Sequence, residues 1–457
     1  MEGSARLINC YAEQTGDDAK APWTLYPSSG LDVWTTVPAT GTSSGVTGVR
    51  AFLATDSYLY VVAGRNVTAI DALGVQTAII TLPGDGDVYL AANRRSPTPE
   101  VCLVSDGVGR IITGTSIATI TDPDLPPPVA VSVLDGYFLF PTTFDRVFIS
   151  DEDNGTSIQP LMFGRAQRRS DNTLLALGGE RDAIVFGTDS IEWWNDSPDG
   201  SGNFPFVPLT NINMGCAGAK TVVQLDRTVA WIANDGTVRV LDGYSGARIS
   251  TSAVERALSA ATTTIYGYGW NEPDTGSSYL AWTCDTFTWV YNLRTAKWHE
   301  RQSFRRSNYR GCQTVRWQGM TLMGDYQDGR IYRVSADVYD EGGEPIIMDV
   351  ISPTIHNAPY GMRINAVYVD AVTGVGRGML PADANPSLML STSSDGGQTF
   401  GAQRLIALGA SGDRNRRLKT HRLGAFGPQG CTLKLSCSAS VARALSGLNI
   451  DADRLSP

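Results

Sequence analysis

The chain repeats one local pattern seven times along most of its length. In the clearest copy, the apolar run Ala183–Phe186 is followed by a polar turn, Gly187–Ser190, and by a second apolar run, Ile191–Trp194. Two apolar runs joined by a short turn of Gly, Thr, Asp and Ser predict a β-hairpin. The turns of the seven copies are 37–51 residues apart and lie near Arg65, Gly107, Phe144, Thr188, Asp235, Thr286 and Asp328.

Such a period predicts how the hairpins pack. A single hairpin cannot bury its apolar face in water, whereas sheets arranged radially around an axis cover both faces of one another. A repeat of this length with paired strands in each unit is typical of a β-propeller. We therefore predict an all-β protein with a propeller of about seven blades over residues 49–340. The alternative is an irregular array of β-sandwiches in which the even spacing is accidental.

The two flanks of the propeller differ from it. Residues 1–48 contain one predicted strand, Arg6–Gln14, and then an extended arm that either closes the ring or clasps a neighbouring subunit. Beyond the Gly- and acid-rich segment Tyr339–Pro345, residues 345–457 contain short alternating strands that predict a C-terminal β-sandwich domain. These strands are Ile364–Val372, Ser387–Ser393, Gln403–Leu408 and Thr432–Ser438, and one helix is predicted over Ser252–Ala260.

Composition excludes several functional classes. The net charge of −9 leaves the chain without the basic footprint of a sequence-reading DNA protein. No run approaches the roughly 18–20 apolar residues that a membrane-spanning helix needs. The seven cysteines form no CxxC pair, which indicates reduced thiols, and three histidines offer little material for a metal centre. We find no catalytic motif and expect no catalytic residue, metal ligand or cofactor.

Two local motifs indicate turns rather than chemistry. The acidic segment Ile149–Ile158 is similar to a calcium loop but lacks the further ligands and flanking helices, so an acid-capped turn is favoured. Residues Ser393–Phe400 match the Asp box of sialidases, in which Asp395 accepts turn N–H groups, Gly397 provides a positive φ and Phe400 packs beneath. A glycan-binding or sialidase-like propeller is the alternative function, although this chain has a single copy outside the predicted propeller.

Two segments concentrate positive charge, and each has two interpretations. In Trp298–Gly311, arginines alternate with aromatic residues, which fits nucleic acid or, as we favour in an acidic chain, an acidic protein partner. In Gly412–Arg422 the charge either guards an edge strand or forms a docking strip for an acidic partner. The candidate docking residues are Arg301, Arg305, Arg306 and Arg310 in the first segment and Arg414, Arg416, Arg417 and Lys419 in the second.

The order of many short segments resembles one known family, the tail hub or nozzle proteins of short-tailed phages (podoviruses), also called packaged-DNA stabilisation proteins. The similarity covers nearly the whole chain. It is carried by INCYAEQ, ITDPDLP, VLDGYFLF, ISDEDNGTSI, FGTDSIEWW, NMGCAGAKTVVQLDRTVAWIANDG, ISTSAVERAL, WVYNLRTAKWHER, GDYQDGRIYRV, SLMLSTSSDGGQTF and NRRLKTHRLG.

The resemblance implies a structural virion protein. Members of the family form a ring, expected to be hexameric, below the portal and its adaptor or connector ring, and they carry tail spikes, fibres or a needle. DNA is expected to pass through the ring without tight binding, because a surface of its own sign does not hold a phosphate backbone. We expect the protein to reside in the virion tail, after assembly in the host cytoplasm.

Overall fold

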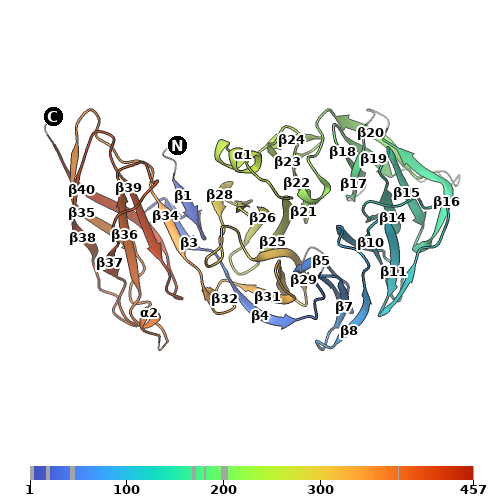
Figure 1. The fold of residues 1–457 in the computed structure, drawn as a ribbon, viewed down its shortest axis with the longest axis horizontal. Helices are drawn as coiled ribbons and strands as arrows, with labels where there is room; N and C mark the ends of the chain where they lie inside the picture. Colours follow the sequence, from blue (N-terminus) through green and yellow to red (C-terminus); the bar gives the residue numbers. More distant parts are fainter. Residues whose placement is uncertain are drawn as a thin grey trace.

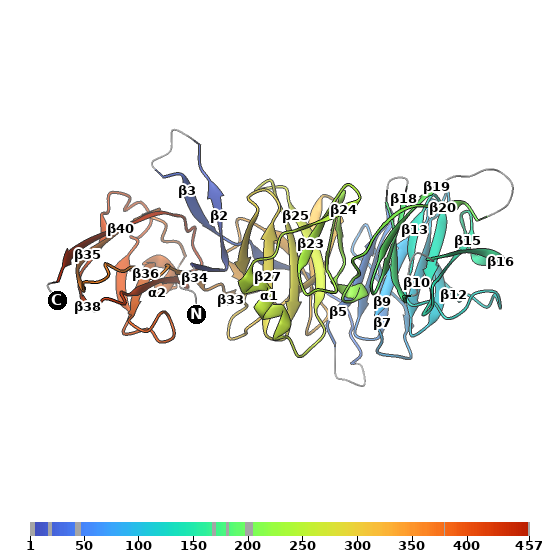
Figure 2. The same ribbon diagram turned by 90° about the horizontal axis from the view of Figure 1, so that it is seen from above.

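The computed structural model describes residues 5–16, 21–41, 47–166, 171–179, 182–196, 204–378 and 380–455. Figure 1 shows a ring of small sheets around one axis, with a two-layered β-sandwich attached at one side. Seen from above, the two parts form one elongated molecule (Figure 2). No helix in the described part of the chain is long and apolar enough to cross a membrane.

Seven four-stranded antiparallel blades make up the ring, so the predicted propeller of about seven blades is confirmed. The first three blades are β5 (Val49–Ala54) to β8 (Gln76–Thr81), β9 (Val88–Ala92) to β12 (Ser116–Thr119), and β13 (Ser132–Leu134) to β16 (Asn154–Arg165). Their remaining strands are β6 (Tyr58–Ala63), β7 (Asn66–Asp71), β10 (Glu100–Ser105), β11 (Val108–Thr113), β14 (Tyr137–Pro141) and β15 (Arg146–Asp151).

The next three blades follow in the same order. They are β17 (Thr173–Gly178) to β20 (Phe206–Ile212), β21 (Val223–Leu225) to β24 (Ser245–Arg248), and β25 (Tyr266–Glu272) to β28 (Lys297–Glu300). The short 3-10 helix η1 (Ala219–Thr221) precedes β21, and the predicted helix is α1 (Ser252–Ser259). The remaining strands are β18 (Asp182–Gly187), β19 (Ile191–Asp196), β22 (Thr228–Ile232), β23 (Val238–Asp242), β26 (Ser277–Cys284) and β27 (Phe287–Asn292).

The seven predicted hairpins are the two middle strands of the blades. In blade four, β18 pairs with β19 in the register Ala183↔Trp194 and Val185↔Glu192. The middle strands are the most apolar because the neighbouring blades cover both of their faces. Each of the seven interfaces between blades contains its own cluster of buried apolar side chains.

The seventh blade is completed by the N-terminal part of the chain. Strands β29 (Gly311–Trp317), β30 (Met320–Asp325) and β31 (Arg330–Ser335) are joined at the outer edge by β4 (Gly30–Thr36). The register Leu31↔Val334 is antiparallel, and β29 also contacts β5 of the first blade. The N-terminal arm, for which the sequence left two possibilities, therefore closes the ring within its own chain.

The N-terminal segment contains more regular structure than the single strand and extended arm predicted for residues 1–48. It forms four strands, because residues 23–36, which were predicted as part of the arm, pair with strands of the sandwich and of the seventh blade. They are β1 (Arg6–Ile8), β2 (Cys10–Gln14), β3 (Trp23–Pro27) and β4.

The C-terminal domain is a β-sandwich, as predicted, and the N-terminal strands contribute to both of its layers. One layer has the strand order β1-β34-β39-β36-β37 and the other β2-β3-β40-β35-β38. Because β1 also pairs with β28 of blade six, the first layer continues into the propeller as one nine-stranded sheet. The C-terminal elements are β34 (Met348–Ile351), β35 (Met362–Ala371), α2 (Pro381–Ala384), β36 (Ser387–Ser393), β37 (Arg404–Ala407), β38 (Leu418–Phe426), β39 (Thr432–Cys437) and β40 (Leu445–Arg454).

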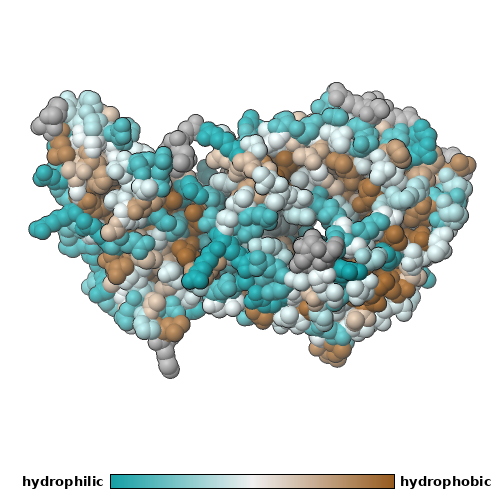
Figure 3. Space-filling model, in the orientation of Figure 1, coloured by the Kyte–Doolittle hydropathy of each residue, from teal (hydrophilic) through white to brown (hydrophobic). Residues whose placement is uncertain are grey.

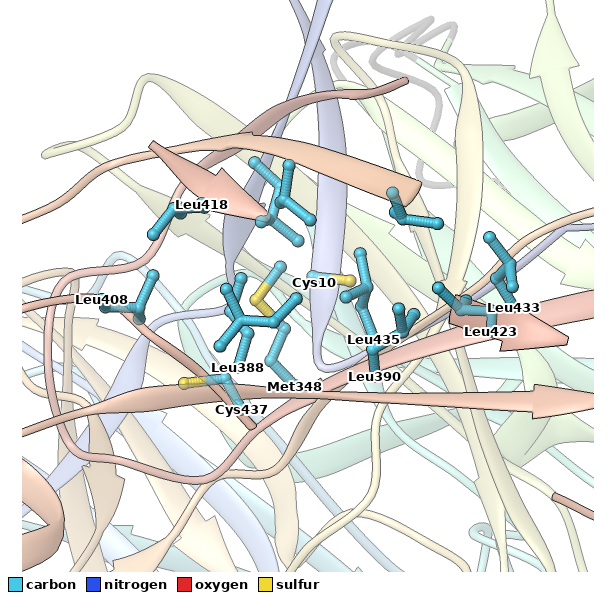
Figure 4. Packing of buried hydrophobic residues seen from close by; sticks show 14 of the residues in the cluster. Cys10, Met348, Leu388, Leu390, Leu408, Leu418, Leu423, Leu433, Leu435 and Cys437 are labelled. Atoms are coloured by element: carbon cyan, nitrogen blue, oxygen red, sulfur yellow. The ribbon is translucent and has the colours of Figure 1, made fainter. Parts of the chain in front are cut away.

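The sandwich core lies between these layers (Figure 4). Leu388, Leu390 and Leu435 extend from the first layer toward Leu418 of the second, and Cys10 enters from β2. A small hairpin, β32 (Asp340–Glu341) and β33 (Glu344–Pro345), leads from the seventh blade to this domain and pairs with β4.

Closure of the ring by β4 gives a prediction about stability. Leu31 is fully buried between blades six and seven, whereas Val33 in the same strand is 43% exposed. The change Leu31→Ala should lower the free energy of unfolding by about 2–5 kcal/mol through the cavity it leaves. Val33→Ala is the matched control and should cost less than about 1 kcal/mol. Denaturant titration followed by tryptophan fluorescence measures both, and equal effects would contradict closure by β4.

Candidate interaction site

A group of exposed cations occupies one edge of the sandwich. Strands β37 and β38 are the edge strands of the two layers, and residues 408–417 connect them. We call this group the basic strip, and all of its members are exposed. The members are Arg404, Arg414, Arg416, Arg417, Lys419 and Arg422.

Few contacts within the chain neutralise the basic strip. Between residues 403 and 426, Asp413 is the single acid, and its carboxylate lies 2.9 Å from Nε of Arg416. The Arg417 guanidinium lies 4.7 Å from the centroid of the Tyr368 ring, a cation–π contact. The strip includes all four residues predicted in this segment. Their exposure fits a docking surface as well as a charged edge that prevents strand addition.

Arg404 was missed by the sequence analysis. Its guanidinium donates hydrogen bonds to the backbone oxygens of His421 and Arg422, at 2.6 and 2.8 Å, and so joins the two edge strands. The only sequence signal was its place in the strand Gln403–Leu408, which does not tell which strand lies beside it.

The first basic segment is different, and the docking prediction is wrong for Arg301 and Arg310. Their side chains are 3% and 1% exposed, so no partner can reach them. Nε of Arg310 donates to the Asp325 carboxylate at 3.0 Å, and Nη1 donates to the Glu341 backbone oxygen, also at 3.0 Å. The Arg301 guanidinium lies over the Tyr309 ring, 4.1 Å from its centroid, and donates to the Glu341 carboxylate at 3.4 Å.

These contacts form a buried polar network that joins three parts of the chain. Arg301 also donates to the backbone oxygen of Ser29, directly before β4, at 3.2–3.3 Å. The Ser29 hydroxyl donates to Glu272 of blade six at 2.6 Å, and the Tyr332 hydroxyl donates to Asp325 at 2.9 Å. The arginines therefore hold the N-terminal strand, blades six and seven, and the hairpin that leads to the sandwich.

Arg305 and Arg306 remain at the surface of the same segment. Arg305 is exposed beside the ring of Phe304, and Arg306 is half-buried and donates to the Tyr326 hydroxyl at 3.1 Å. Arg305 and Arg306 thus each contact an aromatic ring of their own chain. A docking role for Arg305 and Arg306 stays a prediction.

The Asp box is built as a turn. The Asp395 carboxylate accepts hydrogen bonds from the backbone N–H groups of Gln398 and Thr399, at 2.9 and 3.0 Å. Gly397 has a φ of +87° and donates its N–H to the Ser393 hydroxyl, and Phe400 lies beside Gly397. The Ser393 hydroxyl, followed by the Thr399 groups, holds the pKa of Asp395 well below its ordinary value.

Carboxylates gather at one end of blades three and four, in a group we call the acidic corner. The turn between β13 and β14, the turn between β15 and β16, and the end of β19 meet there. Burial and a hydrogen bond with Asp135 raise the pKa of Asp196 to about 6. Arg94 lies 3.0 Å from Asp135 and 2.8 Å from Glu152. The corner consists of Asp135, Asp151, Glu152, Asp153 and Asp196.

A polar cavity of about 380 Å³ opens where the inner strands of several blades begin. Arg50, Asp87 and Lys220 line it together with threonine and tyrosine side chains. Lys220 donates to the Val88 backbone oxygen at 2.7 Å and lies 3.7 Å from the centroid of the Tyr89 ring. Burial lowers the pKa of Lys220 to about 8. Arg50 and Lys220 donate to backbone oxygens of their own chain, and the lining of the cavity indicates no particular ligand.

The more reactive side chains lie inside the protein. All seven cysteines are buried and unpaired. Burial lowers the pKa of His299 to about 3, so its imidazole is neutral at physiological pH. Within the described ranges, no three or more His, Cys, Asp or Glu side chains are grouped so that they could hold a metal ion.

Comparison with known families matches both parts of the molecule. Residues 23–339 match the β-propeller of bacteriophage P22 Gp10, and residues 348–453 match the β-sandwich of the same protein. The chain belongs to the P22 Gp10 family of phage packaged-DNA stabilisation proteins. It is therefore a structural protein of the virion. No curated protein matches the chain significantly.

Solved structures share the propeller at low sequence identity. The WD40 propeller of Doa1 is 12% identical, with a TM-score of 0.42, and the match covers 67% of this chain and 97% of that one. Virginiamycin B lyase from Staphylococcus aureus is 12% identical, with a TM-score of 0.47 and coverages of 66% and 98%. One match is a designed protein, Ika8, at 13% identity and a TM-score of 0.40, covering 72% and 99%. The likeness concerns the fold alone.

The buried network predicts a large effect of removing one arginine. Arg310→Met should lower the free energy of unfolding by about 3–5 kcal/mol, because the buried Asp325 carboxylate loses its partner at 3.0 Å and keeps the more distant Arg330, at 3.7 Å. Adding Asp325→Leu should recover much of the loss, since both charges are then absent. Arg305→Met in the same segment is the control. Denaturant titration measures all three, and equal stability of Arg310→Met and Arg305→Met would contradict the assignment.

The Asp box predicts a pH dependence of known sign. Because the native pKa of Asp395 is below its ordinary 3.8, its contribution to stability is present above that pH and is lost as the pH falls further. Asp395→Asn should therefore melt at a lower temperature than wild type at neutral pH, and the gap should narrow in acid below about pH 4. The exposed Ser394→Ala is the control in melting curves across pH. A gap independent of pH would contradict a charged turn acceptor.

Proposed function

We propose that this protein is the tail hub, or nozzle, of a short-tailed phage. Copies form a ring, expected to be a hexamer, below the portal and its adaptor or connector ring. The ring surrounds the DNA exit channel and anchors a spike, fibre or needle. The observation that carries the proposal is that both domains match the P22 Gp10 family in order, over residues 23–339 and 348–453.

The features of the chain agree with a structural role and suggest no reaction. The docking surface we favour is the basic strip, which is exposed and, apart from Asp413, free of acids in its own segment. The Asp box works as a turn, and we assign no enzymatic activity to the polar cavity lined by Arg50, Asp87 and Lys220. The protein is made and assembled in the host cytoplasm, where its seven cysteines stay reduced.

Retention of DNA in this proposal is steric. Each copy has a net charge of −9, so a ring of copies repels a polyanion as a whole. A wall that bound phosphates tightly would hinder exit, because every bound phosphate adds an attachment. The ring and the appendage that it carries instead close the channel mechanically.

The experiment that tests the proposal is deletion. Phage that lack only this protein should package DNA and then lose it from otherwise complete heads, because nothing closes the exit. DNA content per head, measured after purification by sedimentation, should return to normal when the wild-type protein is supplied in trans. Heads that keep their DNA without the protein would remove the stabilising role.

A separate measurement tests the steric account. The purified protein should bind duplex DNA weakly at physiological salt, with an affinity that falls as salt rises. Fluorescence anisotropy of a labelled duplex over a salt series measures this. Tight binding that resists salt would show that the protein itself holds the DNA.

A further inference from the structure

Two oppositely charged surfaces lie at opposite ends of the molecule. The basic strip is on the sandwich, and the acidic corner is on blades three and four of the propeller, far from the sandwich in both ribbon views (Figures 1 and 2). Residues 120–160, which contain most of the corner, hold seven acids and the single base Arg146. Because the two ends are so far apart, the strip of one copy cannot reach the corner of the same copy.

The carboxylates of the acidic corner repel one another in the isolated chain. Asp135 and Asp196 lie close enough to share a proton, and the neighbouring acids add charge of the same sign. Arg94 is the cation that contacts Asp135 and Glu152, and it balances only part of this charge. An arriving cation would relieve the repulsion.

Exposed apolar side chains accompany both surfaces. In the outer strand of blade three, residues 159–162 bulge outward opposite the single residue Ile149, and Leu161 on the bulge is 83% exposed. Val207 and Leu209 are exposed on the outer strand of blade four. On the sandwich, Leu405 is 72% exposed directly beside Arg404 of the basic strip. Figure 3 shows apolar and hydrophilic residues intermixed at both ends of the molecule.

We propose that the basic strip of one copy docks on the acidic corner of the next copy, with Leu405 against the apolar outer strands of blades three and four. The contact is heterologous, so repeating it generates a ring when the rotation between copies closes. The inference rests on the proposed function in that it supplies the contact between neighbouring copies. It also gives a role to the excess positive charge of the strip, since Asp413 is the single acid between residues 403 and 426.

The test uses two charge-reversed full-length variants. The strip variant carries Arg414→Glu, Arg416→Glu and Arg417→Glu, and the corner variant carries Asp135→Lys, Glu152→Lys and Asp196→Lys. Each alone should self-associate about 100-fold more weakly than wild type, because like charges then face each other. An equimolar mixture of the two should regain association, because each reversed surface meets its complement on the other variant. Analytical ultracentrifugation at low and physiological ionic strength measures all four samples.

Matched controls separate this contact from general charge effects and from misfolding. Arg316→Glu with Lys297→Glu, and Asp56→Lys with Asp274→Lys, reverse exposed charges outside both surfaces and outside the candidate docking residues, and these variants should associate like wild type. Recovery in the mixture also shows that both variants are folded, and near-ultraviolet circular dichroism checks each one alone.

The outcomes distinguish the inference from the proposed function. Failure of the mixture to recover, or variants that associate like wild type, would overturn the strip-to-corner contact. A wild-type chain that stays monomeric at every concentration and salt would overturn it as well. The hub function fails separately, if heads that lack the protein keep their DNA.

Discussion

Pairing of β4 with β31 is the interaction on which the rest of the structure depends. In a propeller built from consecutive hairpins, no covalent link joins the first and last blades. The ring is closed when one blade contains strands from both ends of the propeller chain. In this chain the closing strand is β4 of the N-terminal arm, whose Leu31 is buried between blades six and seven. The strands before it, β1 and β2, continue into the two layers of the sandwich. One short segment thus closes the ring and fastens the second domain to it.

The buried arginines reinforce the same junction. Arg301 and Arg310 lie where β4, the last two blades and the hairpin β32–β33 meet, and each one bonds to more than one of these parts. A buried ion pair needs good geometry, because the free energy lost on desolvating the two charges is about as large as the free energy gained from their attraction. The network therefore favours one relative placement of propeller and sandwich. In the ring that we propose, such a fixed placement sets the direction in which the two ends of each copy meet the neighbouring copies.

The sequence predicted the parts of the fold that depend on local pattern. The middle strands of each blade are apolar on both faces, so the seven hairpins, with turns from Arg65 to Asp328, were recognisable. Strand β4 was not, since Gly30–Thr36 lies within a stretch rich in Pro, Ser and Thr and its partner strand is about 300 residues away. Contacts between distant parts of the sequence were also what the prediction of the docking residues lacked. Arg310 and Arg414 both belong to basic segments, but the fold places Asp325 beside Arg310 and leaves Arg414 exposed to solvent.

The closing strand also sets the order in which the protein can mature. Residues such as Asp32 leave the ribosome early, but Arg333, to which Asp32 is bonded across the strands, is separated from it by 301 residues. At about 5–20 residues per second, the N-terminal strand waits on the order of 15–60 s for its partner. During that time β4 has an unpaired edge, and neither domain is complete. A chain that stops before Arg333 therefore has neither a closed ring nor a sandwich, and one that stops between Arg333 and β40 has a ring without a complete sandwich.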